Sequence, residues 1–157
     1  MMLSHLDKDG KASMVDVTDK ETTVRTAAAV GEVKLNEEAF DAIIKDKNKK
    51  GDVLTVANIA GINAAKRTSE IIPLTHQINL THVNIEFKLD EDEKLVKITA
   101  TSKAKDGTGV EMEALTAVTV SALTIYDMCK SVDRTIEISN VKLIFKSGGK
   151  SGIFENE

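Results

Sequence analysis

Apolar and polar residues alternate along the chain with two periods, one typical of strands and one typical of helices. The apolar residues of 22–33 predict a first strand. Asn36 caps a first helix over 37–45, and Asp52 caps a second helix from 53 to about 70. The second helix is apolar nearly all round, which predicts burial on more than one side. In a domain this small, the cover expected for its second side is another subunit.

The second half of the chain predicts a hairpin, a long helix and a last strand. Pro73 ends the preceding helix, and the alternating stretches 78–89 and 95–101 flank an acidic turn. Residues 109–130 form one uninterrupted helical pattern, and 136–145 form a final strand. The order strand, helices, hairpin, helix, strand predicts an α+β fold. We expect a ferredoxin-like antiparallel sheet with helices packed on one face, plus an extra N-terminal helix.

Composition narrows the class of protein. The 157 residues are enough for one domain with a buried core. We expect this domain over 15–157, preceded by a mobile polar arm of residues 1–14. The net charge of -4 argues against a nucleic-acid binder. One cysteine cannot form an internal disulfide. The sequence shows no signal-peptide pattern and no membrane-spanning apolar run, so we expect a cytoplasmic protein that binds no membrane.

The long helix carries charged residues at both ends. Glu111 and Glu113 stand in its first turn, where the helix dipole is the favoured explanation for carboxylates and a chemical role is the alternative. Asp127 and Lys130 stand three apart at its other end, where a surface ion pair and a catalytic pair are equally good interpretations. Cys129 falls in the apolar stripe and is interpreted as a packing residue. The two ends are about 20 Å apart at 1.5 Å per residue, which predicts two half-sites joined by an oligomer.

Further candidates lie in loops. His76 follows the proline turn, where a site between elements can form, although a lone loop histidine is slightly more often structural. Cations gather at three positions of this acidic chain: Lys45, Lys47, Lys49, Lys50, Lys66, Arg67, Lys146 and Lys150. Two such groups brought together would bind a polyphosphate. The glycine-rich stretch 147–152 lacks the P-loop pattern and a following helix, so we do not interpret it as one.

Several of these segments together resemble one known family. The matching stretches are 50–53, 59–62, 64–68, 72–76, 109–117, 122–130 and 146–152. From about residue 13 to residue 152 the chain is similar to cyclic pyranopterin monophosphate synthase, the molybdenum cofactor biosynthesis protein C family. Motifs of this length in this order are highly specific.

The resemblance implies an enzyme of molybdenum cofactor (molybdopterin) biosynthesis. Its reaction would convert (8S)-3',8-cyclo-7,8-dihydro-GTP to cyclic pyranopterin monophosphate with release of pyrophosphate. It implies a homohexamer, a trimer of dimers, with active sites at subunit interfaces, and an upstream radical S-adenosylmethionine GTP cyclase. We expect no metal and no cofactor. The alternative is a non-catalytic purine-nucleotide-binding regulatory domain, because ferredoxin-like folds host many such roles.

The resemblance also assigns roles to residues of this sequence. The expected catalytic residues are Asp127, Lys130, Lys50 and His76. The expected substrate-binding residues are Leu74, Thr75, His76, Met112, Glu113, Lys66, Arg67, Lys146 and Lys150. We expect Asp127 and Lys130 to act as an acid–base pair, with His76 beside them. Thr75 stands where the family usually has cysteine, so a thiol is not available at that position.

Overall fold

The computed structural model describes residue 7, residues 9–45 and residues 50–156. Part of the predicted arm, residues 1–6 and 8, lies outside the described residues, as do residues 46–49 of the basic loop. The elements in chain order are β1 (Thr23–Lys34), α1 (Glu37–Ile44), α2 (Val53–Lys66), α3 (Thr68–Ile71), β2 (Leu80–Asp90), β3 (Leu95–Asp106), α4 (Glu111–Cys129), β4 (Glu137–Ser147) and β5 (Phe154–Glu155).

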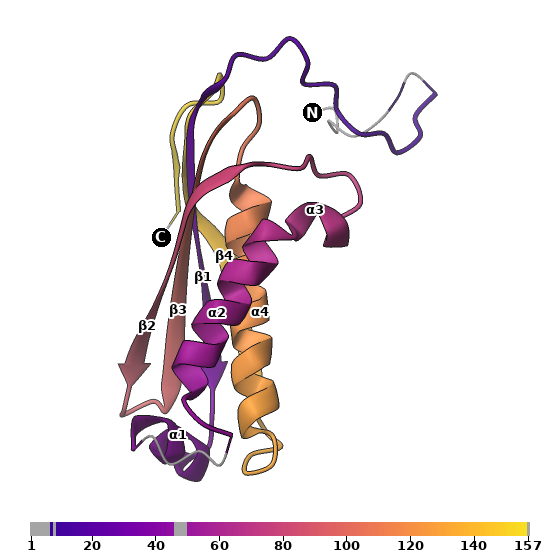
Figure 1. The fold of residues 1–157 in the computed structure, drawn as a ribbon. Coiled ribbons are helices and arrows are strands. Elements are labelled where there is room, and N and C mark those ends of the chain that lie inside the picture. Colours follow the sequence, from indigo (N-terminus) through magenta and orange to yellow (C-terminus); the bar gives the residue numbers. More distant parts are fainter. Residues whose placement is uncertain (1–6, 8, 46–49, 157) are drawn as a thin grey trace.

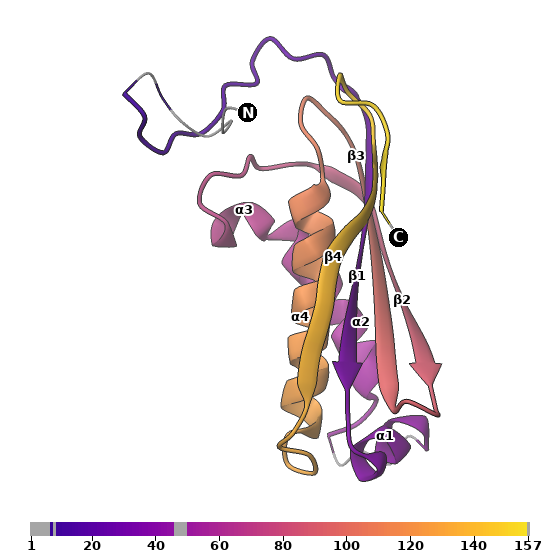
Figure 2. The same cartoon turned by 180° about the vertical axis from the view of Figure 1, so that it is seen from behind.

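The strands form one antiparallel sheet in the order β2-β3-β1-β4-β5. Helices α2 and α4 cover one face of this sheet, and α1 lies beside the end of the sheet where β1 stops (Figures 1 and 2). The first four strands and the two covering helices follow the ferredoxin-like order, with α1 and α3 added. This confirms the predicted α+β class.

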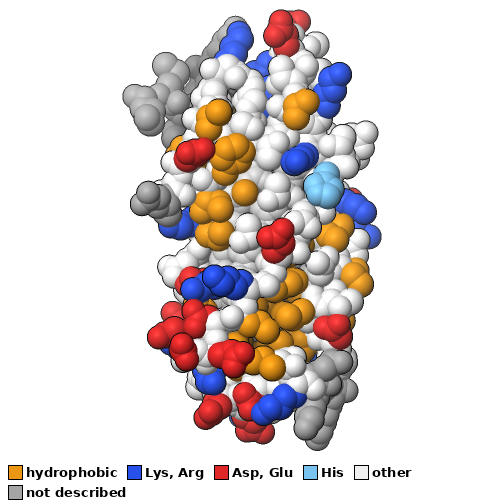
Figure 3. Space-filling model, turned by 90° about the vertical axis from the view of Figure 1, so that its left-hand side faces the viewer, with side chains coloured by type: hydrophobic (Ala, Val, Ile, Leu, Met, Phe, Trp, Pro, Cys, Tyr) orange, Lys and Arg blue, Asp and Glu red, His pale blue; other side chains and the backbone are white. Residues whose placement is uncertain are grey.

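The two faces of the sheet differ in what covers them. Along β1, Ala27, Ala29 and Val33 point to the helices and are fully buried. Ala28 and Val30 alternate with them and point to the other face, which no helix or strand of the described residues covers (Figures 1 and 2). Figure 3 shows that open face, where apolar side chains gather between charged ones. The core therefore lies between the sheet and the helices.

Helices α2 and α4 approach each other at a glycine. A Cβ atom on Gly61 would lie 2.2 Å from Ser121 Oγ and 2.9 Å from the carbonyl oxygen of Ala117. The Ser121 hydroxyl donates a buried 3.0 Å hydrogen bond to the carbonyl of Ala57. Small residues thus bring the two helices into near backbone contact, as expected from a chain poor in aromatic residues.

The inner side of α4 is completely buried. Val118, Ala122, Ile125 and Cys129 have no exposed surface, so Cys129 is the packing residue that its position in the stripe predicted. Neither α4 nor any other helix in the described part of the chain is long and apolar enough to cross a bilayer.

Two features of the fold differ from the pattern of the sequence. The helix predicted from 53 to about 70 breaks at Arg67 (φ -114°, ψ 14°), which separates α2 from α3. The buried Thr68 hydroxyl lies within 3.0 Å of the Ala65 carbonyl and 3.3 Å of the Ala64 carbonyl, and side-chain bonds of this kind compete with helix continuation. The short strand β5, which pairs with β4, was not predicted.

The outer side of the helical layer remains apolar. Val56, Ile59, Ile71 and Leu123 are each 41–56% exposed although all four are large hydrophobic residues. The all-round apolar character predicted for the second helix is therefore present, and in the single chain this side is open to solvent.

One buried carboxylate ties the end of α4 to the start of α1. Asp133 is 2% exposed. It accepts hydrogen bonds from the backbone N–H of Asn36 at 2.6 Å and from the N–H and hydroxyl of Thr135 at 2.7 Å each. Burial raises the pKa of Asp133, but these hydrogen bonds outweigh burial and hold its pKa below the ordinary value.

Replacing Gly61 with alanine tests the close helix contact. The added methyl group has no room against Ser121, so α2 and α4 must separate, and we expect unfolding to become easier by about 1–3 kcal/mol. Urea denaturation measures this free energy. Asn63→Ala, at an exposed position of the same helix, is the control and should leave stability within about 0.5 kcal/mol. Equal stability of the two variants would contradict the close contact between α2 and α4 at Gly61.

Replacing Asp133 with asparagine tests the buried carboxylate. The carboxylate has a lowered pKa, so its contribution to stability is present above the ordinary aspartate pKa and is lost as the pH falls through the folded-state pKa. We expect Asp133→Asn to lose about 1.5–3 kcal/mol near neutral pH. This difference from wild type should shrink below about pH 4. Thermal melts over a pH series measure it, and a pH-independent difference would contradict the assignment.

Candidate functional site

Two neighbouring cavities lie where α4 begins. Figures 1 and 2 show that α4 begins at the end of the sheet reached by β4. The larger, of about 1030 Å³, is lined by parts of 19–26, 107–111 and 146–151. The smaller, of about 270 Å³, is lined by parts of 15–20, 74–78 and 108–113. Lys20, Thr108, Gly109 and Glu111 line both. The two cavities are therefore neighbours at the start of α4.

Charged residues of both signs line the larger cavity. The cations are Lys20, Arg25, Lys146 and Lys150, and the carboxylates are Asp19, Glu21 and Glu111. The Arg25 guanidinium is held by the backbone carbonyls of Asp106 and Gly107, at 3.2 Å each. These carbonyls orient the guanidinium without neutralising it, and no ion pair of Arg25 is found among the described residues. A fixed guanidinium beside lysines suits the oxygens of phosphate groups.

A pair of glycines completes the wall of this cavity. Gly148 and Gly149 have φ values of 101° and 72°, a region that side chains rarely adopt. A Cβ atom on Gly149 would lie 1.8 Å from Arg25 Nη1, and one on Gly148 would lie 2.2 Å from the Val24 carbonyl oxygen. The loop after β4 thus needs glycine at both positions to pass next to Arg25.

The smaller cavity has an apolar wall and a polar wall. Val15, Val17, Leu74, Ile78 and Met112 supply apolar surface. The polar side chains that join them are Lys20, Thr75, His76, Thr108, Glu111 and Glu113. A cavity of this kind suits a flat heterocycle whose faces are apolar and whose edge makes hydrogen bonds.

His76 connects the smaller cavity to the segment before β1. Its Nε2 atom lies 2.7 Å from the carbonyl oxygen of Val15. A carbonyl only accepts, so this ring nitrogen carries the hydrogen and donates the hydrogen bond. The neighbouring Thr75 hydroxyl donates to the carbonyl of Ile72 at 2.9 Å. The proline turn and the segment at residues 15–17 therefore form one wall of the smaller cavity.

The two glutamates in the first turn of α4 have different surroundings. Glu111 forms a 2.6 Å ion pair with Lys146. Glu113 is 3% exposed, and its Oε2 atom is buried without a hydrogen-bond partner in the described structure. Burial raises the pKa of Glu113 to about 7, and the nearby Glu111 and Asp106 carboxylates add to this effect. At neutral pH Glu113 can therefore either donate or accept a proton.

A second group of charges lies at the far end of α4. Asp127 pairs with Lys130 at 2.6 Å and with Lys50 at 3.4 Å. The Lys50 ammonium also donates to the Asp127 backbone carbonyl at 2.7 Å. The hydrogen bond from Lys130, with the charges of both lysines, lowers the pKa of Asp127, while Asp127 raises the pKa of Lys130. All three side chains are between 43% and 60% exposed, so this is a surface cluster.

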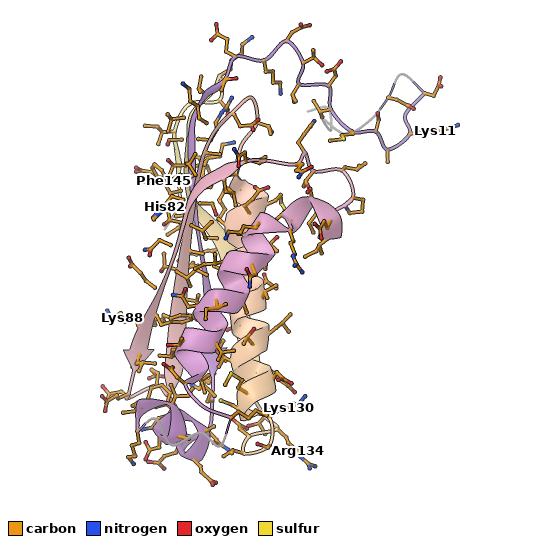
Figure 4. All side chains as sticks on the ribbon, viewed as in Figure 1. Lys11, His82, Lys88, Lys130, Arg134 and Phe145 are labelled. Carbon is orange, nitrogen blue, oxygen red and sulfur yellow. The ribbon has the colours of Figure 1, made fainter. Side chains whose placement is uncertain are left out.

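The sequence-predicted residues thus divide into separate groups within one chain. Leu74, Thr75, His76, Met112 and Glu113 line the smaller cavity, and Lys146 and Lys150 line the larger. Lys50, Asp127 and Lys130 lie together at the opposite end of α4, about 20 Å away by helix length. Figure 4 shows Lys130 at that end, beside Arg134.

Two predicted substrate-binding cations belong to neither group. Lys66 ends α2 and Arg67 follows it, and both are exposed. They line neither cavity. Both precede α3, which lies toward the same end of the molecule as the start of α4 (Figure 1).

Two residues that line the larger cavity were not predicted as site residues. Arg25 lies in the predicted first strand, and a charged residue beside Val24 and two positions before three alanines was a usable signal. Lys20 falls in a polar segment with no distinguishing pattern. Glu111, for which the helix dipole was the favoured explanation, pairs with Lys146 and lines both cavities.

Fold and cavities together define a ferredoxin-like α+β protein with a large cavity lined by charged residues and a smaller cavity beside it that contains a buried carboxyl group. The sequence profile of the MoaC family matches residues 14–149, and the chain belongs to this family.

Relatives match over nearly their whole length. A cyclic pyranopterin monophosphate synthase from Thermoanaerobacter sp. (strain X514) is 52% identical over 157 residues, which cover 100% of this chain and 99% of the relative. The protein of the same name from Peptoclostridium acidaminophilum is 53% identical with the same coverage. That from Magnetococcus marinus is 54% identical over 97% of this chain and 93% of its own length. The name shared by these relatives is that of an enzyme.

Proposed function

We propose that this protein is a cyclic pyranopterin monophosphate synthase of molybdenum cofactor biosynthesis. It converts (8S)-3',8-cyclo-7,8-dihydro-GTP to cyclic pyranopterin monophosphate and releases pyrophosphate. Full-length relatives with this name support the proposal. The observation that carries it is that a large cavity with four cations in its lining shares wall residues with a smaller carboxylate-bearing one. This pair matches a substrate with a triphosphate at one end and a purine-derived ring at the other.

The larger cavity takes the triphosphate in this proposal. Arg25 and Lys146 face the phosphates, and Lys150 and the amides around Gly148 and Gly149 complete the binding. The reaction closes a cyclic phosphate when an alcohol of the substrate attacks the innermost phosphorus. Pyrophosphate leaves, and cations at the outer phosphates stabilise the charge that develops on it.

The smaller cavity takes the ring system. Opening of the purine and closure of the pyranopterin require proton transfers at several atoms, so acid–base groups on more than one side of the substrate are needed. His76 and Glu113 supply such groups from one chain, with Leu74, Thr75 and Met112 as contacts. Asp127, Lys130 and Lys50 supply the remaining catalytic charges, with Asp127 ionised at neutral pH by its lysines.

The distance along α4 makes an oligomer part of the proposal. A substrate cannot contact Glu113 and Asp127 of one chain when about 20 Å of helix separates them. Two chains packed with antiparallel α4 helices would bring the start of one helix to the end of the other. The exposed apolar side chains of α2, α3 and α4 provide a surface for this contact. Lys66 and Arg67 lie in the same helical layer and would contribute phosphate contacts across it.

The wider assignments follow from the same proposal. The assembly is a homohexamer built as a trimer of dimers, and the catalytic unit comprises residues 15–157. The enzyme works in the cytoplasm, without a metal or cofactor of its own. A radical S-adenosylmethionine GTP cyclase acts before it and supplies the cyclised nucleotide.

Activity on the cyclised nucleotide is the direct test. We expect the wild-type protein to release pyrophosphate and form a pterin whose oxidation product is fluorescent. Asp127→Asn and Lys130→Met should each lower kcat by about 10²-fold or more, because each removes one partner of the acid–base pair. Lys88→Ala is the control, because Lys88 lies exposed on β2 and lines neither cavity (Figure 4).

The same assay separates the enzyme from a regulatory domain. A protein that binds purine triphosphates and turns over nothing would contradict the proposed function. Normal turnover in the Asp127 and Lys130 variants would instead remove these two residues from the mechanism. The proposed reaction would still stand, because the wild-type protein would have formed the product.

Mixing inactive subunits tests the shared site. His76→Ala impairs the half-site at the start of α4, and Asp127→Ala impairs the half-site at its end. After subunit exchange, half of the dimers are mixed, and one of the two sites in each mixed dimer is intact. We therefore expect about a quarter of the wild-type activity to return.

A matched mixture provides the control. Lys50 and Asp127 lie 3.4 Å apart in one chain and belong to the same half-site. A mixture of Lys50→Ala and Asp127→Ala subunits should therefore recover no activity, because every site contains one damaged end. Equal recovery in the two mixtures, with exchange verified by affinity tags, would contradict the two-chain site.

A further inference from the structure

The segment before β1 forms a wall of both cavities although it belongs neither to the sheet nor to a helix. We call residues 15–20 the N-terminal strap. Val15 and Val17 line the smaller cavity, Asp19 lines the larger one, and Lys20 lines both. In Figures 1 and 2 this segment leaves the start of β1 and crosses the end of the molecule where α4 begins. The strap is therefore a wall that the two cavities share.

Local hydrogen bonds give the strap a shape of its own. The Asp16 carboxylate accepts hydrogen bonds from the backbone N–H of Thr18 at 2.9 Å and from the Thr18 hydroxyl at 2.6 Å. The backbone N–H of Lys20 donates to the Val17 carbonyl at 3.0 Å. Val15 and Val17 are half-buried, whereas Asp16 and Thr18 are exposed, so the apolar side of the strap faces inward. The turn keeps this shape without support from the sheet.

Two small contacts hold the strap against the cavities. The 2.7 Å hydrogen bond from His76 to the Val15 carbonyl is the one that joins the strap to another part of the described chain. The loop after β3 supplies the second contact, because a Cβ atom on Gly107 would lie 3.4 Å from Lys20 Cβ and 3.7 Å from the Val17 carbonyl oxygen. A segment with so few attachments opens at a lower free energy than the packed sheet and helices.

We propose that the N-terminal strap is a gate, which swings away from the proline turn and the loop after β3 to admit the nucleotide and then closes over it. This inference rests on the proposed function, which supplies the nucleotide. Closure covers the ring with Val15 and Val17 and places Lys20 at the boundary of the two cavities. It also keeps bulk water from the smaller cavity, where the reaction requires proton transfers.

A disulfide between the strap and the loop after β3 tests the gate. In the double variant Lys20→Cys/Gly107→Cys the two Cβ atoms would lie 3.4 Å apart. This is close to the separation of about 3.5–4.5 Å that disulfides require. The new Cβ at position 107 meets no atom closer than 3.4 Å, so the substitution fits the closed strap. Mass spectrometry identifies the new bond, and the native Cys129 is buried away from it.

Binding of GTP is then compared between the oxidised and reduced forms of this double variant. A disulfide formed in the empty protein holds the gate shut, so GTP should associate at least about 10-fold more slowly than with the reduced form. A disulfide formed after GTP has bound should slow its dissociation by at least about 10-fold. Rapid filtration with radiolabelled GTP measures both rates. Both forms lack the lysine, so the comparison isolates the effect of closing the strap.

The two single variants are matched controls. Lys20→Cys and Gly107→Cys receive the same oxidant and reductant, but neither can form the bond between strap and loop. Their GTP association and dissociation rates should therefore be equal in the two forms. A change on oxidation in either single variant as large as that in the double variant would overturn the proposal.

Val17→Ala tests the gate with Lys20 in place. Loss of apolar contact weakens the closed strap more than the open one, so GTP should dissociate about 3-fold to 10-fold faster, with no slower association. A thermal melt verifies that the variant is folded. Slower association with unchanged dissociation would contradict a gate that Val17 helps to close.

The disulfide experiment decides between a gate and a fixed wall. Equal GTP rates in the oxidised and reduced double variant would show a fixed wall and overturn the proposal. Failure of the disulfide to form would contradict the contact at Gly107 and overturn it too, as would the absence of GTP binding by the wild-type protein. The proposed function is judged separately, because it fails only if the wild-type protein forms no product from the cyclised nucleotide.

Discussion

The close packing of α4 between α2 and β1 is the constraint on which the rest of the structure depends. A glycine faces α4 on each side. A Cβ atom on Gly61 of α2 would lie 2.2 Å from Ser121, and one on Gly31 of β1 would lie 2.5 Å from Val118. Neither neighbour leaves room for even a methyl group, so α4 is fixed against both layers at near backbone contact. A helix held this firmly places the residues at its two ends without adjustable loops.

The fixed position of α4 explains why the predicted site residues fall into two separate groups within one chain. The start of α4 presents Glu113 to a cavity whose other walls come from residues 15–20, from 74–78 and from the loop before α4. Its end presents Asp127 to Lys50 and Lys130 on an open surface. A packed helix cannot bend to join these ends, so an active site that uses both must draw them from different copies of the chain. The oligomer in the proposed function is a consequence of helix geometry as well as of family resemblance.

The sequence predicted the fold better than it predicted the cavities. Alternation and capping residues located the main strands and helices because those signals are local, as at Asn36 and Asp52. The sequence pattern did not predict the break between α2 and α3 at Arg67. This break depends on the carbonyls that the buried Thr68 hydroxyl contacts, which only the folded structure shows. Arg25 escaped because its orientation comes from carbonyls 81 and 82 residues away. Family resemblance predicted a role for Glu113, but only the structure shows that its Oε2 atom is buried without a hydrogen-bond partner among the described residues.

The charge states of the two half-sites complement each other. Asp127 with Lys50 and Lys130 carries one net positive charge, and hydrogen bonds keep the aspartate ionised. If a second chain covers this cluster, burial opposes every charge in it, but the two lysines continue to favour the ionised aspartate. The facing half-site would offer Glu113 with a pKa of about 7. A fixed carboxylate on one side and a carboxyl group that changes charge on the other give one cavity two acid–base groups with distinct proton affinities. That difference is what a reaction with several proton transfers requires.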